Sequence, residues 1–330
     1  MAEIDVAGTG HAQVKRLRGR VAGQLSFVYG SLGPLMAYMM FFSLLPILWA
    51  VALGFFDYSP VRVGGGFLGL GGANSFVGLA NYRAMFTETQ PARVFRLALF
   101  NTFIFACLVL PLNLAITLPL AVLVDSVHDR FKGLFRAIYF LPTITSTAAV
   151  ALIWQIIYLP QTGLLHMLIK GIGLTPPRNW LVDAQTTVLG IPIPLIAIII
   201  AYLWQDFGYN LVIFIAALQA IPRDFHDAAM VDGANPWHEF WRITLPLLKP
   251  TLLFVCVLTM LSSLQVFSTI YVMYTSNPPE YVYTLMIEIY QNAFRYQNMG
   301  WAAAIAMVLF LIIAGFTFFQ FRFLRTDWEY

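Results

Sequence analysis

The sequence predicts an all-α integral membrane protein with six transmembrane helices. Of its 330 residues, 59% are hydrophobic and only 11% are charged, whereas a soluble domain is about half apolar and about a quarter charged. Six apolar segments are long enough to cross a bilayer core, which needs about 20 helical residues. They must be helices because lipid offers no partner to an open backbone hydrogen-bonding group.

The predicted spans are separated by polar connections along the chain. They cover residues 33–56, 98–124, 136–158, 190–220, 251–274 and 299–321. The first follows basic residues as a signal peptide would, but its apolar stretch of about 23 residues is too long for a signal core, so we expect it to be retained. The fourth is long enough to tilt or to extend beyond the membrane.

Lys and Arg placement predicts that both termini are cytoplasmic, because basic residues favour the inner side of a membrane. With the N-terminus inside, 12 of the 19 Lys and Arg residues fall on inner segments. The predicted organisation is then a cytoplasmic tail (1–30), a first helix with a long outer loop (31–97), a five-helix membrane domain (98–321) with an inner loop at 222–250, and a cytoplasmic tail (322–330).

Catalytic and metal-binding motifs are not found in the sequence. The run Gly64–Gly69 formally matches GxGxxG, but it neither follows a strand nor opens a βαβ unit, so a flexible outer loop is the better interpretation. There is no GxxxxGK[ST] phosphate loop, no HExxH and no GxSxG. The two cysteines, Cys107 and Cys256, lie in apolar stretches and resemble buried thiols rather than a metal set. We therefore predict no catalytic residue and no metal ligand.

The inner loop after the fourth span begins with a predicted short helix. Pro222 suits a first helical turn because no amide donor is needed there. Residues 223–232 contain good helix formers. Gly233 can adopt the left-handed conformation that ends a helix.

A second short helix is predicted directly after this bend. Asn235 can cap it, Pro236 suits its first position, and Pro246 is expected to end it. Phe240 and Trp241 give it an apolar side. Taken alone, this pattern fits equally well an amphipathic helical hairpin lying on the membrane surface.

The loop resembles the "EAA" motif of permease subunits in bacterial ATP-binding-cassette importers. The motif is Glu-Ala-Ala, three residues, Gly, nine residues, then Ile-x-Leu-Pro; here it reads Asp227-Ala228-Ala229, then Gly233, then Ile243-Thr244-Leu245-Pro246. The one departure is Asp227, whose side chain is one methylene shorter than the family's Glu. The segments 76–82, 218–222 and 300–304, and Trp204, also resemble sugar permeases of the maltose type.

The resemblance implies a type I importer permease fold and a mechanism. The motif would form a coupling helix docked on a cytoplasmic ATPase, and an extracytoplasmic solute-binding protein would deliver a sugar or oligosaccharide. Implied partners are a second homologous permease and two ATPase subunits, which would bind the ATP and Mg; no cofactor is expected in this chain, and no nucleic acid. The membrane would be the bacterial or archaeal cytoplasmic membrane. The residues implied in coupling are Asp227, Ala228, Ala229, Asp232, Gly233, Ala234, Ile243, Leu245 and Pro246.

A candidate substrate path comes from polar residues inside the spans, which are costly unless they face a cavity or a partner. Asp206 is the only acidic residue well inside a predicted span, and it shares a helix face with Tyr202, Gln205, Tyr209 and Asn210. The resemblance places sugar contacts at Tyr202, Gln205 and Asp206. The third and fifth spans offer further polar candidates: Thr143, Ser146, Ser262, Ser263 and Gln265.

Three alternatives stay open at this stage. The polar residues would serve equally well as hydrogen-bonding links between helices. An ion-gradient-driven secondary transporter could use Asp206 as the ion carrier, although no repeat is evident. Within the importer class, the solute could also be glycerol phosphate, a polyamine or an acidic oligosaccharide.

Overall fold

The computed structural model describes residues 28–62 and 72–324. Four helices in this part are long and apolar enough to cross a membrane, and two bent helix pairs raise the number to six if each is one span. The predicted number of six spans is the upper end of this range. The basic residues of the N-terminal tail, the glycine run at 64–69 and Arg325 lie outside the described residues.

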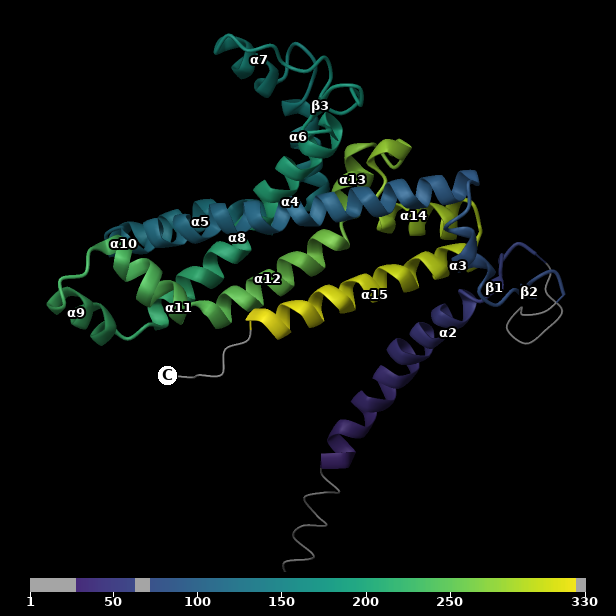
Figure 1. Ribbon diagram of the computed structural model, residues 1–330, viewed down its shortest axis with the longest axis horizontal. Helices are drawn as coiled ribbons and strands as arrows, with labels where there is room; N and C mark the ends of the chain where they lie inside the picture. The colour runs from purple at the N-terminus through teal and green to yellow at the C-terminus, as the bar shows by residue number, and fades with distance from the viewer. Residues whose placement is uncertain (1–27, 63–71, 325–330) are drawn as a thin grey trace, which may run out of the picture.

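Four long helices form the body of the protein. They are α4 (Gln90–Ser126), α8 (Ile193–Ala220), α12 (Lys249–Leu264) and α15 (Met299–Leu324). Figure 1 shows them side by side with nearly aligned axes, α12 running opposite to α4, α8 and α15; α4 packs on α8, and α12 contacts both α4 and α15. Prolines at 111 and 119 lie inside α4 without ending it.

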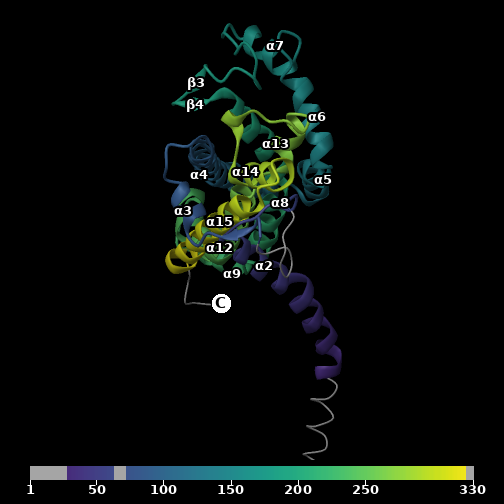
Figure 2. The ribbon, with the colours of Figure 1, turned by 90° about the vertical axis from the view of Figure 1, so that its right-hand side faces the viewer.

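The first span diverges from this body. It begins at Val28, passes through a π-helical turn at Met40–Leu44 and ends as α2 (Leu45–Leu53). None of its most apolar 18 residues is buried. Figures 1 and 2 show the first span leaving the bundle at an angle. Its C-terminal part, α2, contacts α15.

The C-terminal end of α2 is tied to the bundle by polar contacts. The Asn81 amide, on α3 (Ala80–Ala84), donates to the carbonyl oxygens of Gly54 and Phe56, each at 3.0 Å. Strand β1 (Phe56–Asp57) pairs antiparallel with β2 (Ser75–Phe76). The Gly300 amide donates to the Tyr58 carbonyl at 3.0 Å, and a Cβ at position 300 would collide with the Phe56 carbonyl oxygen. Two of the sequence segments that resemble sugar permeases thus meet here.

The third span is bent. Helices α5 (Asp129–Ile144) and α6 (Thr147–Ile157) meet at 95°, so the prediction of one continuous span over 136–158 is wrong. Beyond the bend, α6 packs against α13 (Ser268–Met273). It then leads to α7 (Leu164–Gly171) and to a hairpin of β3 (Thr187–Val188) and β4 (Ile191–Pro192), which extend away from the bundle in Figures 1 and 2.

The fifth span also differs from its prediction. Helix α12 ends at Leu264, and the chain is not helical at residues 265–267 before α13 begins, so the predicted span over 251–274 is interrupted. At its inner end, α12 meets the preceding helical segment Pro236–Leu247 at 68°. The fourth span agrees with the prediction, since α8 covers Ile193–Ala220.

The segment between the fifth and sixth predicted spans contains short helical turns, with a buried side and an exposed side. After a 3-10 turn (Glu280–Val282), α14 (Leu285–Tyr290) and a π-helical turn (Gln291–Arg295) pack between α4 and α15. Asn101 of α4 donates to the Tyr281 and Tyr283 carbonyls at 3.1 and 2.9 Å, and the Leu285 amide donates to Thr102 Oγ1 at 2.8 Å. These contacts satisfy backbone groups that lack a helical partner.

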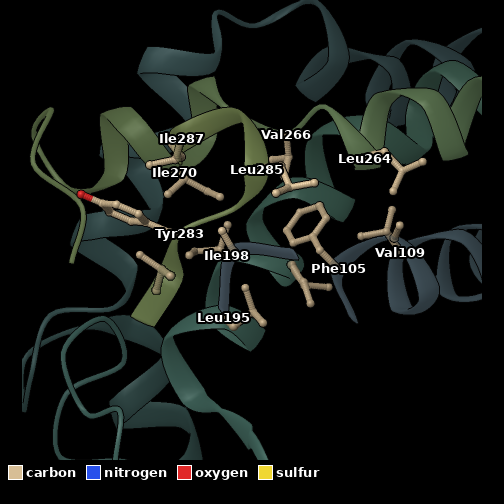
Figure 3. Close-up of a cluster of buried hydrophobic side chains, with 14 of the residues drawn as sticks. Phe105, Val109, Leu195, Ile198, Leu264, Val266, Ile270, Tyr283, Leu285 and Ile287 are labelled. Atoms are coloured by element: carbon tan, nitrogen blue, oxygen red, sulfur yellow. The ribbon is translucent and has the colours of Figure 1, made fainter. Parts of the chain in front are cut away.

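The largest apolar cluster joins four of these elements. Figure 3 shows Phe105 of α4 with Leu285 of α14 above it, Ile198 of α8 on one side, and Val109 of α4 with Leu264 of α12 on the other. All five side chains are fully buried. Since lipid is as apolar as these side chains, close van der Waals packing rather than exclusion from water holds this cluster together.

Candidate functional site

A polar cavity of about 300 Å³ lies among α5, α6, α8, α12 and α13. It is lined by Thr143, Thr147, Tyr202, Gln205, Asp206, Ser262, Gln265, Val266, Phe267, Ser268 and Thr269. Asp206 is the one charged side chain among these lining residues. Hydroxyl and amide groups with a few rings are suited to an uncharged, polyhydroxylated solute.

Both interruptions of the spans face this cavity. Residues around the α5–α6 bend (Thr143, Thr147) line one side, and residues of the α12–α13 break (Gln265–Ser268) line the other. Irregular backbone at membrane depth is tolerated only where it is enclosed by protein or borders a water-filled cavity. Both breaks therefore lie where irregular backbone can be accommodated, because protein encloses it or the polar cavity borders it.

Gln205 of α8 stabilises the bend between α5 and α6. Its amide donates to the Thr145 carbonyl at 3.0 Å and to Thr147 Oγ1 at 3.2 Å. The Thr143 hydroxyl donates in return to the Gln205 carbonyl at 2.8 Å. Close approach is possible because Gly208 lies against Tyr139, where a Cβ would collide with backbone. The bend is thus held by α8 rather than by its own helix.

Asp206 belongs to a hydrogen-bond network that connects three helices. Its Oδ2 accepts from Asn113 Nδ2 of α4 at 3.0 Å. Asn210 Nδ2 donates to Asn113 Oδ1 and to Thr259 Oγ1 of α12, both at 2.9 Å. Asn113, Asn210 and Thr259 are fully buried. The carboxyl group is therefore fixed at the cavity wall by partners on the side away from the cavity.

The structure brings six of the nine predicted path residues to the cavity wall: Thr143, Tyr202, Gln205, Asp206, Ser262 and Gln265. Three others are not among the lining residues. Ser146 is exposed, Tyr209 is 48% exposed, and the buried Ser263 hydroxyl donates to the Met260 carbonyl. Asn210, on the same predicted face, serves the network between helices. A role in substrate binding stays a prediction for the six.

Sequence reasoning missed Asn113 and the cavity-lining residues at the α12–α13 break, which include Ser268 and Thr269. Asn113 was not singled out, although an amide in the middle of the second predicted span was a usable signal. Val266 and Phe267 reach the cavity only because the helix is broken there, and the predicted continuous span gave no sign of that break.

The inner loop forms the two predicted helices with a sharp bend. Helix α9 (Arg223–Val231) is followed by Gly233 at φ +73°, and the Ala234 amide bonds back to the Ala229 carbonyl at 2.9 Å. Asn235 Oδ1 accepts from the His238 amide at 2.8 Å, so the predicted cap of α10 (Pro236–Glu239) is confirmed.

Two details of the loop prediction are wrong. Pro222 precedes α9 instead of occupying its first turn. Pro246 does not end the second helix, which continues through a π-helical turn (Phe240–Thr244) into α11 (Leu245–Leu247). Pro246 occupies the first turn of α11, directly after the π-helical turn.

The loop presents a concave surface at the end of the molecule where α9 and α10 lie in Figure 1. A depression of about 380 Å³ is lined by Ala229, Asp232, Gly233, Ala234, Asn235, His238, Arg242 and Ile243. Asp227 and Ala228 are exposed on α9, and Leu245 and Pro246 are half-buried in α11. Five of the nine predicted coupling residues thus border one depression.

The loop is joined firmly to the membrane helices. Ile221, Leu247 and Leu248 form a small buried cluster against Leu118 and Leu218. His226 Nδ1 and Glu239 Oε1 are in hydrogen-bonding contact, which links α9 to α10. A force applied to α9 would therefore reach α8 and α12, the helices that border the cavity. Among the residues that the structure describes, no group of His, Cys, Asp and Glu is arranged to hold a metal ion.

Comparison with known proteins gives matches over most of the chain. The family described as "Binding-protein-dependent transport system inner membrane component" matches residues 117–324. The osmoprotective compounds uptake permease of Synechocystis sp. is 34% identical over 287 residues, which cover 85% of this chain and 92% of that protein. The arabinooligosaccharides permease of Bacillus subtilis is 32% identical (74% of each chain), and the lactose permease protein of Rhizobium radiobacter 30% identical (87% and 90%).

A solved structure shares the fold. A chain of a bacterial ABC transporter involved in import of the acidic polysaccharide alginate matches with a TM-score of 0.76 at 20% identity, covering 95% of this chain and 100% of that one. The predicted type I importer permease fold is thereby confirmed.

Proposed function

The chain belongs to the family of binding-protein-dependent transport system inner membrane components, and on this premise we propose that it forms half of a translocation path for a neutral sugar or oligosaccharide. The observation that carries this proposal is the polar cavity between two broken helices. Its lining of hydroxyls and amides suits a polyhydroxylated solute, and relatives named for lactose and arabinooligosaccharides agree with that choice. The single carboxyl group, Asp206, disfavours an anionic solute.

The coupling loop supports a separate ATPase as the motor. The depression between α9 and α10, with the exposed Asp227 beside it, is of a size to receive a helix or side chains of another subunit. We infer that two ATPase subunits bind ATP and Mg, and that this chain hydrolyses none. Movement of α9 would then tilt α8 and α12 and open the cavity to one side or the other.

Two further partners complete the proposal. A second homologous permease would provide the other half of the path and cover part of the first span, whose most apolar residues are unburied in the single chain. A solute-binding protein would dock on the opposite, extracytoplasmic end. Both termini would lie in the cytoplasm of a bacterial or archaeal cell.

The test is uptake by the assembled importer in proteoliposomes. Asp227→Lys should reduce ATPase docking and ATP-driven uptake at least about tenfold, since it reverses a charge at the proposed contact. Glu88→Lys is the matched control, because Glu88 is an exposed acid (side chain 90% exposed) outside the inner loop; it should change uptake less than about twofold. Normal docking and uptake in Asp227→Lys would refute the assigned role of this residue, and gradient-driven uptake by the chain alone would favour a secondary transporter.

A further inference from the structure

Four aromatic side chains form a continuous cluster next to the cavity. Phe267 directly precedes α13 and Tyr271 lies within it, whereas Tyr290 ends α14 and Phe294 lies on the π-helical turn that follows. The Phe267 and Tyr271 rings stack with centroids 5.0 Å apart. Tyr290 contacts both, at 5.1 and 5.0 Å, and Phe294 follows at 5.2 Å from Tyr290. We call these four residues the aromatic cluster.

The cluster extends from the cavity to the protein surface. Phe267 is itself a cavity-lining residue, whereas Phe294 is 62% exposed. Helix α12 runs from the coupling loop to Leu264, so α13 and the cluster lie beyond the cavity, on the side away from the ATPase-facing loop. A solute that enters from the extracytoplasmic side would meet these rings before it reached Asp206.

The geometry of the cluster is set by polar contacts around it. The hydroxyl groups of Tyr271 and Tyr290 are 3.1 Å apart. Arg295 donates to Asn277 Oδ1 at 2.9 Å and to the Ser276 carbonyl at 2.6 Å, which fixes the turn after α13 next to Phe294. π-Helical turns such as the one carrying Phe294 are frequent at functional sites.

The surrounding backbone is strained. Thr275, Ser276 and Gln297 are non-glycine residues with φ between +51° and +66°. Such conformations cost of the order of 1–3 kcal/mol each and cluster at functional sites. A simple packing role would bury the rings and would not need this strain, and an interfacial aromatic belt would distribute its rings around the protein at the membrane surface.

We propose that the aromatic cluster is a binding site for sugar rings at the extracytoplasmic entrance of the cavity. A pyranose or furanose ring has C–H groups on one face, which pack against an aromatic ring, and hydroxyl groups on its rim, which the Tyr271 and Tyr290 hydroxyls can bond. Three partly exposed rings and one exposed ring, about 5 Å apart, would let a sugar pass from one to the next. The proposal rests on the carbohydrate function argued above.

The test measures weak sugar binding without transport. The assembled importer is placed in nanodiscs without nucleotide or binding protein, and saturation-transfer NMR gives a Kd for lactose as a ring-containing probe and for sorbitol as an acyclic polyol. The double variant Tyr290→Leu/Phe294→Leu should raise the lactose Kd about fivefold or more, as expected for the loss of two ring contacts. The matched control Phe310→Leu/Phe318→Leu changes two exposed aromatic residues of α15 (61% and 74% exposed) and should leave the Kd unchanged.

A second variant separates the ring from its hydroxyl group. Tyr271→Phe keeps the stacked ring and should raise the lactose Kd by a factor of only about two. Sorbitol should bind at least about fivefold more weakly than lactose to the unaltered protein, because it offers no ring face. An unchanged lactose Kd in the double leucine variant, no detectable lactose binding to the unaltered protein, or equal binding of sorbitol would overturn the proposal. ATP-driven sugar uptake is measured in parallel, and its absence would overturn the proposed function instead.

Discussion

The Asn113–Asp206 hydrogen bond connects the cavity wall to α4, and exchanging its two partners tests the network around it. The Asn113 amide donates to the Asp206 carboxyl group at 3.0 Å and its carbonyl oxygen accepts from Asn210 at 2.9 Å. An Asp at 113 could still accept from Asn210 and from an Asn at 206. The doubly exchanged protein therefore keeps the same set of donors and acceptors with the carboxyl group moved by one residue.

The two single variants should lose different amounts of unfolding free energy. Asn113→Asp places two carboxyl groups against each other in a buried site, and removing the partner of a buried charge costs about 3 kcal/mol. Asp206→Asn retains a neutral amide pair and should cost about 1 kcal/mol. If the two sites were independent, the double variant would lose about 4 kcal/mol. Since the pair is restored, we expect it to lose only about 1 kcal/mol, which is a coupling of about 3 kcal/mol.

Reversible unfolding of the four proteins in bicelles measures this coupling. Asn101→Asp is a control, since Asn101 is an equally buried amide of α4 that bonds to the Tyr281 and Tyr283 carbonyls instead of to α8; it should show no coupling to Asp206→Asn. A double variant as unstable as the sum of its single changes would refute the assigned network.

Three further predictions concern the coupling loop and the buried acid of α14. Gly233→Ala should destabilise the loop by about 1–2 kcal/mol in thermal unfolding, because Gly233 has φ +73° and a Cβ is disfavoured there. His226→Ala should increase the ATP hydrolysed per solute imported, since the contact with Glu239 joins α9 to α10. Burial raises the pKa of Glu288 to about 7, so the folded protein favours the neutral carboxyl group. The free energy of unfolding should therefore fall by about 3 kcal/mol as the pH rises from 4.5 through 7. Glu288→Gln should remove this pH dependence.

Each of these has a control and a contradicting outcome. Gly315→Ala, where a Cβ meets nothing within 4 Å in α15, should not destabilise the protein because Ala is the better helix former, and an equal loss in both glycine variants would contradict the argument from φ. An unchanged ratio of ATP to solute in His226→Ala would show that the contact with Glu239 does not transmit motion. A melting temperature whose pH dependence survives in Glu288→Gln would assign it to other groups.

The elements that the sequence predicted correctly are those encoded by neighbouring residues. Spans four and six follow from long apolar stretches, and the bend of the inner loop follows from Gly233 and Asn235, whose effects are local. The prediction that Pro246 ends the second helix of the inner loop is wrong, because a proline can occupy the first turn of a helical segment as well as follow the end of one.

The interruptions could not be predicted because their stabilising partners are distant in sequence. The Thr145 carbonyl, freed at the α5–α6 bend, accepts from Gln205, 60 residues away. The Val266 carbonyl, freed at the α12–α13 break, accepts from the Thr284 hydroxyl at 3.1 Å. Helix α14 was missed for a related reason, since it is too short to span a membrane and is ordered by Asn101 and Thr102 of α4.

In the candidate site, too, features set by neighbouring residues were predicted and features set by distant contacts were not. Helical spacing placed Tyr202, Gln205 and Asp206 together correctly, because they lie within one and a half turns of α8. Tyr209, on the same predicted helix face, is 48% exposed and is not among the residues that line the cavity in the single chain. Phe267 was not considered, because only the break turns it toward the cavity.

The central claim is that ATP hydrolysed by other subunits drives sugar through this chain by way of the inner loop. The most direct measurement is uptake of labelled sugar into proteoliposomes that contain the second permease, the ATPase subunits and the binding protein, compared with the same assembly lacking residues 223–246. We predict uptake that requires ATP and is abolished by the deletion, while the deleted chain still assembles with the second permease. Uptake that persists without the loop, or without the ATPase subunits, would contradict the claim.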